Sequence, residues 1–219
     1  MKQISKEALQ LAKYMHDWLN VYTVSIQSNS PHTIRRYSIT LSLFVDFLEK
    51  EKGIIPLNLT SECFSRKYIE DWIMWLKHSR NSSKETCNLR LSAIRSFLKF
   101  LAGKDISYLS LYQTSMLIPM QKTEKRKVTG MTKEAVKTLM SVPDISTKVG
   151  LRDLTLLLVL YCTAARINEV LSAKINQLHI DASKPYITVI GKGRKIRTLY
   201  ILPQACLLYT SPSPRDGLL

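Results

Sequence analysis

The chain has 219 residues, 45% of them apolar, with 32 lysines and arginines against 17 aspartates and glutamates, a formal net charge of +15. This length suits one or two domains, and the apolar content is enough for packed cores, which excludes a wholly disordered chain. Such a positive surplus is typical of proteins whose partner carries many phosphates. An anionic membrane surface is the other such partner, but no basic amphipathic helix with a lipid-facing aromatic edge is evident.

The cysteines and the apolar runs narrow the cellular setting. Cys63, Cys87, Cys162 and Cys206 form no C-x-x-C pair, and no secretory leader is evident, which predicts reduced thiols in a cytoplasmic protein. The longest apolar run, Leu154–Cys162, is far shorter than the roughly 20 residues of a membrane-spanning helix. We therefore expect no membrane partner, and we identify no metal site and no cofactor.

Residues 1–110 are predicted to form a helical bundle. Apolar residues recur at helical spacing between Leu11 and Tyr22 and again between Ile34 and Leu48. Ser30-Pro31 predicts the start of the second of these helices, and Gly53 predicts its end. A third helix is expected over residues 62–78.

The fourth predicted helix begins at a Ser82-x-x-Glu85 capping box and ends at Gly103. One of its faces, opposite the apolar stripe, is basic and polar, and it is either a surface for a duplex backbone or an ordinary solvated face. That face consists of Lys84, Asn88, Arg95 and Lys99. Arg90 instead projects into the apolar stripe, so it must reach out at the edge of the bundle or find a partner. We take Lys84, Arg90, Arg95 and Lys99 as candidate DNA contacts.

Helical periodicity fades over residues 111–131, which we interpret as a basic linker. The segment Gln121–Lys127 contains four cations and one anion. A flexible strap of this kind either crosses a phosphate backbone or is simply a solvated connector. Lys125, Arg126 and Lys127 are its candidate DNA contacts.

Residues 132–205 are predicted to form a second, mixed α/β domain. Thr132 is the expected N-cap of its first helix, and further helices are expected over residues 151–162 and 166–173. Strands rich in β-branched residues follow at residues 186–190 and 196–201. The predicted fold class is therefore mainly α with a small β-hairpin or sheet.

Two short motifs in this second domain carry the chemistry. The first, Thr163-Ala-Ala-Arg166-Ile-Asn-Glu169, places an arginine after a buried-looking helix, where its planar fork can bind phosphate oxygens and Glu169 can hold it. The second, Gly191-Lys192-Gly193-Arg194-Lys195-Ile-Arg197, presents cations at a tight strand turn. Alone, the first motif is an ordinary i, i+3 pair and the second a solvated tip. Together, they could converge on one phosphate.

This combination resembles the first half of the active site of the tyrosine recombinase (phage integrase) family. The resemblance implies a SAM-like core-binding bundle and the start of a catalytic domain that cuts DNA through a 3′-phosphotyrosine, without metal. It implies that Arg166 is a catalytic arginine, Glu169 its support and Lys192 the proton donor to the leaving oxygen. Arg194, Lys195 and Arg197 would contact double-stranded DNA, and the full-length form would assemble as a tetramer on it.

The chain departs from the family pattern at three points. Ala164 stands where the family has glycine, which costs about 1 kcal/mol if the position requires a positive φ. The family's later H-x-x-R, second histidine or tryptophan, and nucleophilic tyrosine have no counterpart after Pro203, so we expect a truncated, inactive fragment. Residues 206–219, with two Ser-Pro units, are interpreted as a non-native tail or a divergent one.

Other interpretations remain open at this level. A non-catalytic DNA-binding accessory or regulatory protein is the main alternative. An RNA-binding protein is less favoured, because the chain shows neither a sheet with paired aromatics nor a G-x-x-G clamp. His32-Thr-Ile-Arg35 has the letters H-x-x-R but lies in the helical domain, so we interpret it as surface or as a DNA-contacting helix. His179 is expected in an exposed loop.

Overall fold

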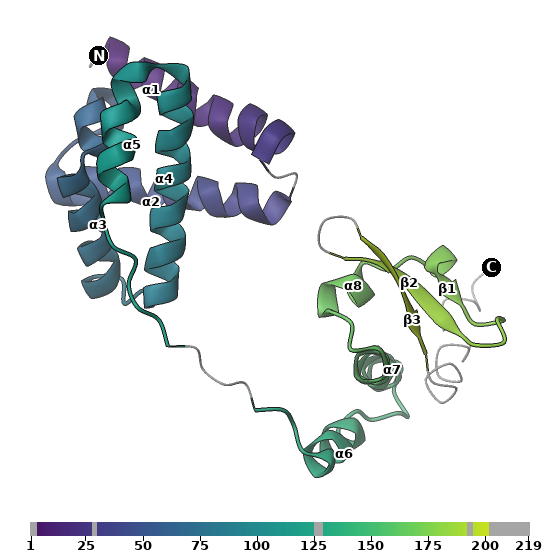
Figure 1. The fold of residues 1–219 in the computed structure, drawn as a ribbon. Helices are drawn as coiled ribbons and strands as arrows, with labels where there is room; N and C mark the ends of the chain where they lie inside the picture. The colour runs from purple at the N-terminus through teal and green to yellow at the C-terminus, as the bar shows by residue number, and fades with distance from the viewer. Residues whose placement is uncertain (1–3, 28–29, 125–128, 192–194, 202–219) are drawn as a thin grey trace. The chain divides into compact units, whose positions relative to one another are not determined.

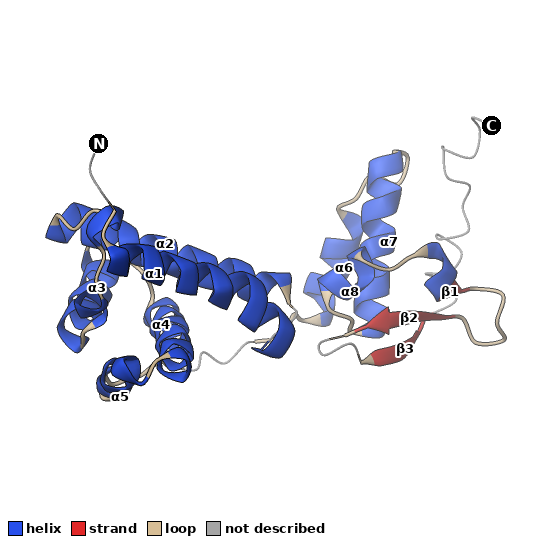
Figure 2. Cartoon of the chain, turned by 90° about the horizontal axis from the view of Figure 1, so that it is seen from above, coloured by secondary structure: helices blue, strands red, loops and turns tan. Residues whose placement is uncertain are grey.

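The computed structural model describes residues 4–27, 30–124, 129–191 and 195–201 (Figure 1). The chain divides into two compact units, residues 1–126 and residues 127–219. The first unit is helical, and the second combines helices with a small antiparallel sheet (Figure 2). The predicted fold class, mainly α with a small β component, is confirmed. Among the described residues, no helix is both long enough and apolar enough to span a membrane.

Helices of several kinds succeed one another in the first unit. They are α1 (Lys6–Asp17), a π-helical stretch (Trp18–Gln27), α2 (Pro31–Lys52), short 3₁₀ turns (Pro56–Asn58 and Ser61–Phe64), α3 (Arg66–His78), α4 (Lys84–Lys104), a third 3₁₀ turn (Ile106–Tyr108) and α5 (Leu109–Met116). Helix α4 is central, because it contacts α2, α3 and α5 (Figure 1).

Aromatic side chains dominate the core of this bundle. Trp18, Phe44, Trp72 and Phe97 are fully buried. The rings of Phe44 and Trp72 meet edge to face with centroids 5.1 Å apart, and Trp18 stacks on Tyr37 at 4.7 Å. Since each such ring removes about 150–250 Å² from water, these side chains supply much of the burial that holds the helices together.

Helix boundaries agree with the sequence on α2 and differ on α4. Helix α2 begins at Pro31 and ends before Gly53, which has a φ of 67°. On α4 the N-cap is Ser83 rather than Ser82, and its Oγ accepts a hydrogen bond from the Thr86 N–H at 3.2 Å. The N–H of Ser82 instead donates to the Leu76 carbonyl, closing the end of α3. Gly103 lies inside α4, which continues to Lys104.

The segment predicted as the start of the linker begins as a helix. Helix α5 occupies Leu109–Met116 and packs against α4, and Ile118 beyond it is buried. The Asn88 side chain bonds both the N–H and the carbonyl of Gln121, each at 2.9 Å. An eight-residue helix is too short for its periodicity to stand out in the sequence. The bundle therefore extends well past residue 110.

Arg95 holds the end of α5, which corrects its interpretation as an exposed basic group. Its Nε and Nη2 atoms donate to the Ser115 carbonyl at 3.0 and 2.9 Å, and Nη2 also donates to the carbonyls of Met116 and Ile118. The last carbonyls of a helix have no partner within the helix. A guanidinium fork fills this need. Of the polar face predicted on α4, Arg95 and Asn88 hold α5 and the segment after it, whereas Lys84 and Lys99 are exposed.

The second unit contains α6 (Lys133–Ser141), α7 (Lys148–Thr163), α8 (Ile167–Leu171), a 3₁₀ turn (Ile175–Gln177), β1 (Leu178–His179), β2 (Tyr186–Ile190) and β3 (Ile196–Tyr200). Thr132 is the N-cap of α6, as predicted, and its Oγ1 accepts from the Ala135 N–H at 3.2 Å. The strands lie in the order β1-β2-β3, all antiparallel.

The sheet positions the candidate site residues of this unit. In the register of β2 and β3, Val189 faces Arg197 and Ile190 faces Ile196. Helix α7 contacts β3 and α8 contacts β2 (Figure 2), and Ile187 and Val189 are buried beneath them. His179, expected in an exposed loop, lies in β1, is half-buried and stacks on Tyr186 with centroids 4.4 Å apart. A two-residue strand gives no alternation by which to recognise it.

Replacing Arg95 tests its structural role. Arg95→Ala should lower the free energy of unfolding by about 2–3 kcal/mol, because the carbonyls that end α5 lose their charged donor. Lys99→Ala, four residues later at an exposed position of the same helix, is the control and should stay within about 0.5 kcal/mol of the parent. Urea unfolding followed by circular dichroism measures both. Equal effects of the two changes would contradict the assignment.

Candidate functional site

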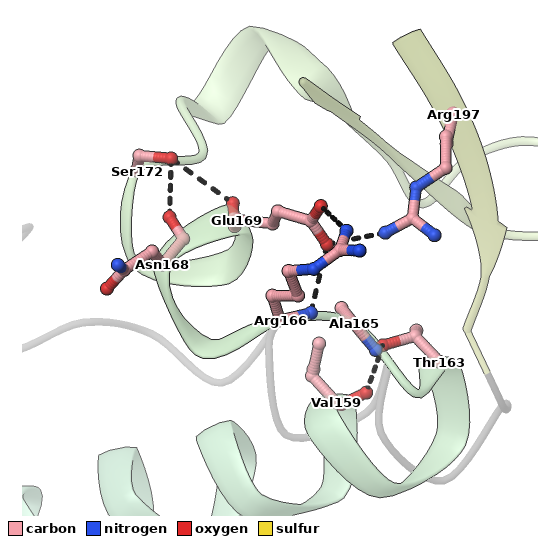
Figure 3. Close-up of polar contacts among 8 residues, drawn as sticks. All are labelled: Val159, Thr163, Ala165, Arg166, Asn168, Glu169, Ser172 and Arg197. Carbon is pink, nitrogen blue, oxygen red and sulfur yellow. Dashed lines mark hydrogen bonds and ion pairs between the residues drawn. The ribbon is translucent and has the colours of Figure 1, made fainter. Parts of the chain in front are cut away.

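A sharp turn at the end of α7 delivers Arg166 to the surface (Figure 3). Helix α7 ends at Thr163, and Ala164 has the left-handed conformation, with φ 49° and ψ 29°. The Thr163 hydroxyl donates to the Val159 carbonyl at 2.6 Å and accepts from the Ala165 N–H at 3.3 Å. Arg166 then takes the N-cap position of α8. The arginine therefore stands on a junction fixed by two helices.

Glu169 is the acceptor around which this site is arranged. Its Oε1 accepts from Arg166 Nη1 at 2.8 Å, and its Oε2 accepts from the Arg166 backbone N–H at 2.9 Å and from Arg197 Nη2 at 2.6 Å (Figure 3). The side chain is only 6% exposed. The backbone N–H of Arg166 is the main cause that lowers the pKa of this carboxyl, burial opposes the shift, and the two guanidiniums add to it.

The two arginines remain open to solvent while Glu169 is buried. The Arg166 side chain is 66% exposed and that of Arg197 is 42% exposed. Two guanidiniums share one carboxylate, so the cluster keeps a net positive charge at the surface. Such a cluster can bind an anion without leaving a buried charge unpaired.

The residues that flank the β2–β3 turn, Gly191 and Lys195, form the hairpin base, and this base lies beside the cluster. The Gly191 N–H donates to the Lys195 carbonyl at 2.8 Å, which closes the ladder above the pair Ile190 and Ile196. A Cβ on Gly191 would lie 3.0 Å from Glu169 Oε1, closer than nine in ten real Cβ contacts. Glycine therefore allows close approach to the carboxylate without displacing it, and it is not required here by an unusual φ.

The predicted site residues fall into three groups. Arg166, Glu169 and Arg197 meet in one network, whereas Lys195 is exposed near it. In the first unit, Lys84 and Lys99 are exposed on α4, whereas Arg90 and Arg95 of the same helix have partners within the fold. The third group lies outside the described part of the chain, as does the segment 206–219, and consists of Lys125, Arg126, Lys127, Lys192 and Arg194.

A second candidate site is a basic cleft on the first unit between α2 and α4. The residues that line it are His32, Arg35, Arg36, Ile39, Thr86, Leu89 and Arg90. Arg90 Nη1 donates to Thr40 Oγ1 at 3.3 Å, and its Nε is buried without a partner among the described residues. Burial lowers the pKa of the Arg90 guanidinium. Arg90 thus has a hydrogen-bond partner and also lines a cleft at the edge of the bundle, the two alternatives that its position in the apolar stripe left open.

Arg36 was missed as a site residue by sequence reasoning, whereas Arg35 belongs to the segment that was interpreted as surface or as a DNA-contacting helix. Both are exposed on α2 and line the same cleft as Arg90 of α4. The adjacent arginines near the start of a helix were the available signal. Their placement beside Arg90 depends on how α2 packs against α4, which the local sequence does not specify.

Comparison with known proteins identifies the family. The model named "Phage integrase, N-terminal SAM-like domain" matches residues 18–104, and the model named "Phage integrase family" matches residues 129–213. The second match overlaps the segment 206–219, whose interpretation as a non-native tail stays a prediction. Both matches agree with the division of the chain into a helical unit and an α/β unit.

Curated relatives and solved structures agree with these matches. The chain is 32% identical over 197 residues to tyrosine recombinase XerC of Chlamydia caviae, spanning 61% of that protein. It is 30% identical over 195 residues to the putative integrase/recombinase y4rD of Sinorhizobium fredii, spanning 69% of it. The fold is similar to that of the XerH site-specific recombinase in a post-cleavage complex with its palindromic difH substrate, with a TM-score of 0.65, 14% identity, and coverage of 93% of this chain and 68% of that one. The chain belongs to the tyrosine recombinase (phage integrase) family.

Ala164 gives a direct test of the turn that presents Arg166. Ala164→Gly should raise the free energy of unfolding by about 1 kcal/mol, because glycine adopts a positive φ without steric cost. Ala165→Gly is the matched control. Ala165 has no positive φ, so glycine there should destabilise by about 0.4–1 kcal/mol through the greater freedom of the unfolded chain. Thermal and urea unfolding measure the pair. Destabilisation by both changes would show that the left-handed turn is not adopted.

Proposed function

We propose that this chain binds duplex DNA and that its second unit carries the first part of a site for cutting and rejoining phosphodiesters. In a complete enzyme the intermediate would be a 3′-phosphotyrosine. The observation that carries this proposal is the state of Arg166, which Glu169 holds at 2.8 Å while the side chain stays 66% exposed. A preorganised guanidinium of this kind is suited to the charge that develops on phosphate oxygens in the transition state.

The roles of the individual residues follow from the proposed chemistry. A tyrosine oxygen attacks phosphorus, and the bond to the 5′-oxygen of the leaving strand breaks. Arg166 stabilises the charge on the non-bridging oxygens, and Glu169 supports Arg166. Lys192 donates a proton to the departing 5′-oxygen. Lys192 lies outside the described residues, but the hairpin base at Gly191 is close enough to Glu169 to support a shared site.

DNA contacts of the first unit would come from the α2–α4 cleft and from the exposed lysines of α4. Arg35, Arg36 and Arg90 line the cleft, and Lys84 and Lys99 are exposed on α4. The complex of XerH with its difH substrate, a protein of similar fold, supports DNA as the partner. Lys195 and Arg194 of the hairpin would add contacts from the second unit. Assembly into a tetramer on DNA is proposed for the complete enzyme.

Salt dependence tests the DNA-binding part of this proposal. The dissociation constant for a duplex should rise steeply with salt, because each neutralised phosphate contributes about 0.9 to the log–log slope. A slope of several units is expected from fluorescence anisotropy between low and moderate salt. Absence of binding at low salt, or a flat salt response, would remove this part of the proposal.

Three linker residues provide a variant for the same assay. Lys125, Arg126 and Lys127, changed together to alanine, should weaken binding similarly on all sequences and reduce the slope. A control with the same loss of charge changes exposed residues outside the proposed contacts, Lys6, Lys13 and Lys50. Equal behaviour of the two triple variants would show that the strap is only a solvated connector.

Cleavage tests the catalytic part and requires a complete enzyme that supplies the tyrosine. Arg166→Ala should slow strand cleavage by about 10²-fold or more with little change in DNA binding, the scale seen when one preorganised donor is lost. Lys192→Ala should also slow cleavage, but a 5′-bridging sulfur substrate needs no proton on its leaving group and should restore much of its rate. Arg166→Ala should gain much less from that substrate.

The outcomes separate the candidate functions. Equal rescue of both variants would contradict the division of roles between Arg166 and Lys192. Normal cleavage by Arg166→Ala would remove the catalytic assignment. A complete protein that binds DNA tightly but never cleaves it would instead support a non-catalytic accessory role.

A further inference from the structure

Arg197 lies near the turn end of the hairpin that carries the proposed proton donor. It is on β3, opposite Val189 of β2, and its Nη2 donates to Glu169 Oε2 at 2.6 Å. A residue expected to contact DNA is therefore already engaged with a buried carboxylate of α8. This contact joins two elements that are far apart in the sequence, the hairpin and the turn that bears Arg166.

Both carboxylate oxygens of Glu169 accept hydrogen bonds, and the donors come from the α8 N-terminus and from the hairpin. Arg166 bonds Oε1 through Nη1 and Oε2 through its backbone N–H, while Arg197 bonds Oε2 from the hairpin. Within the described part of the chain, Nη1 is the guanidinium atom of Arg166 that takes part in these bonds. Any movement of Glu169 away from Arg197 would change how it holds Arg166.

Gly191 shows how tightly the hairpin base is seated. A Cβ at this position would lie 3.0 Å from Glu169 Oε1 and 3.7 Å from Arg197 Nε. The carboxylate therefore sits directly beneath the residue that precedes Lys192. The spacing between the hairpin base and Arg166 depends on this contact together with the Arg197 ion pair.

We propose that Arg197 is a positioning residue, which holds Glu169 from the hairpin side and thereby fixes the orientation of Arg166 and its distance from the hairpin base at Gly191. This inference rests on the proposed function for its catalytic consequence. Arg197 does not touch the phosphate in this assignment. It acts through Glu169, and Glu169 acts through Arg166.

Sharing of the carboxylate gives Arg197 a second effect. With Arg197 absent, a carboxylate that is 6% exposed would face one guanidinium instead of two. Arg166 would then be drawn toward Glu169. More of its N–H donors would bond the carboxylate, and fewer would remain for a bound phosphate. By taking part of the negative charge of Glu169, Arg197 leaves the outer edge of Arg166 available.

The first experiment uses the 219-residue chain without DNA. Carbon-13 NMR of the side-chain carboxyls follows the titration of Glu169 in the parent, in Arg197→Ala and in Arg197→Lys. The charged groups that face Glu169 are Arg166 of the α8 N-cap and Arg197 of β3. Loss of Arg197 should raise the pKa of Glu169, because a group that stabilises the charged carboxylate is removed while burial still disfavours that charge. Arg197→Lys should keep part of the depression, because it restores the charge without the planar fork.

Arg152→Ala is the matched control for this titration. Arg152 also pairs with a carboxylate, that of Asp153 at 2.7 Å, but its side chain is 70% exposed on α7. Its loss removes the same charge from the same unit and should leave the Glu169 titration unchanged. If Arg197→Ala does not fold, the test uses Arg197→Lys alone. A Glu169 pKa equal to that of the parent, together with cleavage at the parent rate, would then overturn the proposal.

The second experiment uses single-turnover cleavage by the complete enzyme. Arg197→Ala should slow cleavage about 10-fold or more, the cost of a small misplacement of a catalytic group, while the duplex affinity and the salt slope stay near the parent values. Because the pKa of Glu169 is lowered by its partners, Glu169 stays charged down to lower pH in the parent. The acid limb of the pH–rate profile should therefore move to higher pH in Arg197→Ala and partly return in Arg197→Lys.

A double-mutant cycle with Glu169→Gln completes the test. Since both residues act through one contact, Arg197→Ala should cause little further loss of rate once Glu169 is neutral. Additive losses, or a uniform loss of affinity with a salt slope lower by about 1, would instead make Arg197 a phosphate contact and overturn the proposal. If the parent enzyme does not cleave DNA, the proposed function fails, whereas the titration result for Glu169 and Arg197 still stands.

Discussion

The carboxylate of Glu169 is the constraint on which the candidate active site depends. A carboxylate that is 6% exposed needs charged partners, because an unpaired buried charge is strongly destabilising. It takes them from the helix junction, through Arg166, and from the hairpin, through Arg197. Two segments are thereby held together, although the paired residues Glu169 and Arg197 are 28 residues apart in the sequence. The same carboxylate lies close to Gly191, where a Cβ would come within 3.0 Å of Glu169 Oε1.

A similar constraint shapes the first unit, where the groups to be satisfied are backbone carbonyls. Helix α5 ends against α4, and its last carbonyls need donors. Arg95 supplies a guanidinium, and Asn88 pairs with both backbone groups of Gln121. In both units an arginine that looks like a surface cation by its sequence position is engaged in satisfying buried or partly buried acceptors. These arginines already donate hydrogen bonds within the fold, so fewer of their donors are available to a ligand.

Sequence patterns predicted many of the features that depend on neighbouring residues alone, although they placed the start of α4 one residue early and its end at Gly103. Pro31 and Gly53 bound α2, Thr132 caps α6, and the β-branched segments form β2 and β3. Features that depend on tertiary contact were missed. Helix α5 has eight residues and is stabilised by α4, and Arg95 bonds carbonyls 20 or more residues away. Arg166 and Glu169 were found because they share one turn of helix, whereas the ion pair of Arg197 crosses 28 residues and gives no local signal.

The distribution of these contacts alters what the net charge of +15 means for DNA binding. Several cations in that sum already have partners in the fold. Lys52 pairs with Asp71, Arg66 with Glu70, and Arg197 with Glu169, while Arg95 is bound to backbone carbonyls. Counterion release counts only the cations that reach phosphates. The expected salt dependence therefore follows the number of cations that reach phosphates rather than the net charge, and the candidates are cations with open surroundings, such as Arg35, Lys84 and Lys99. A cation in this chain is assigned to DNA correctly only after its bonds within the fold have been subtracted.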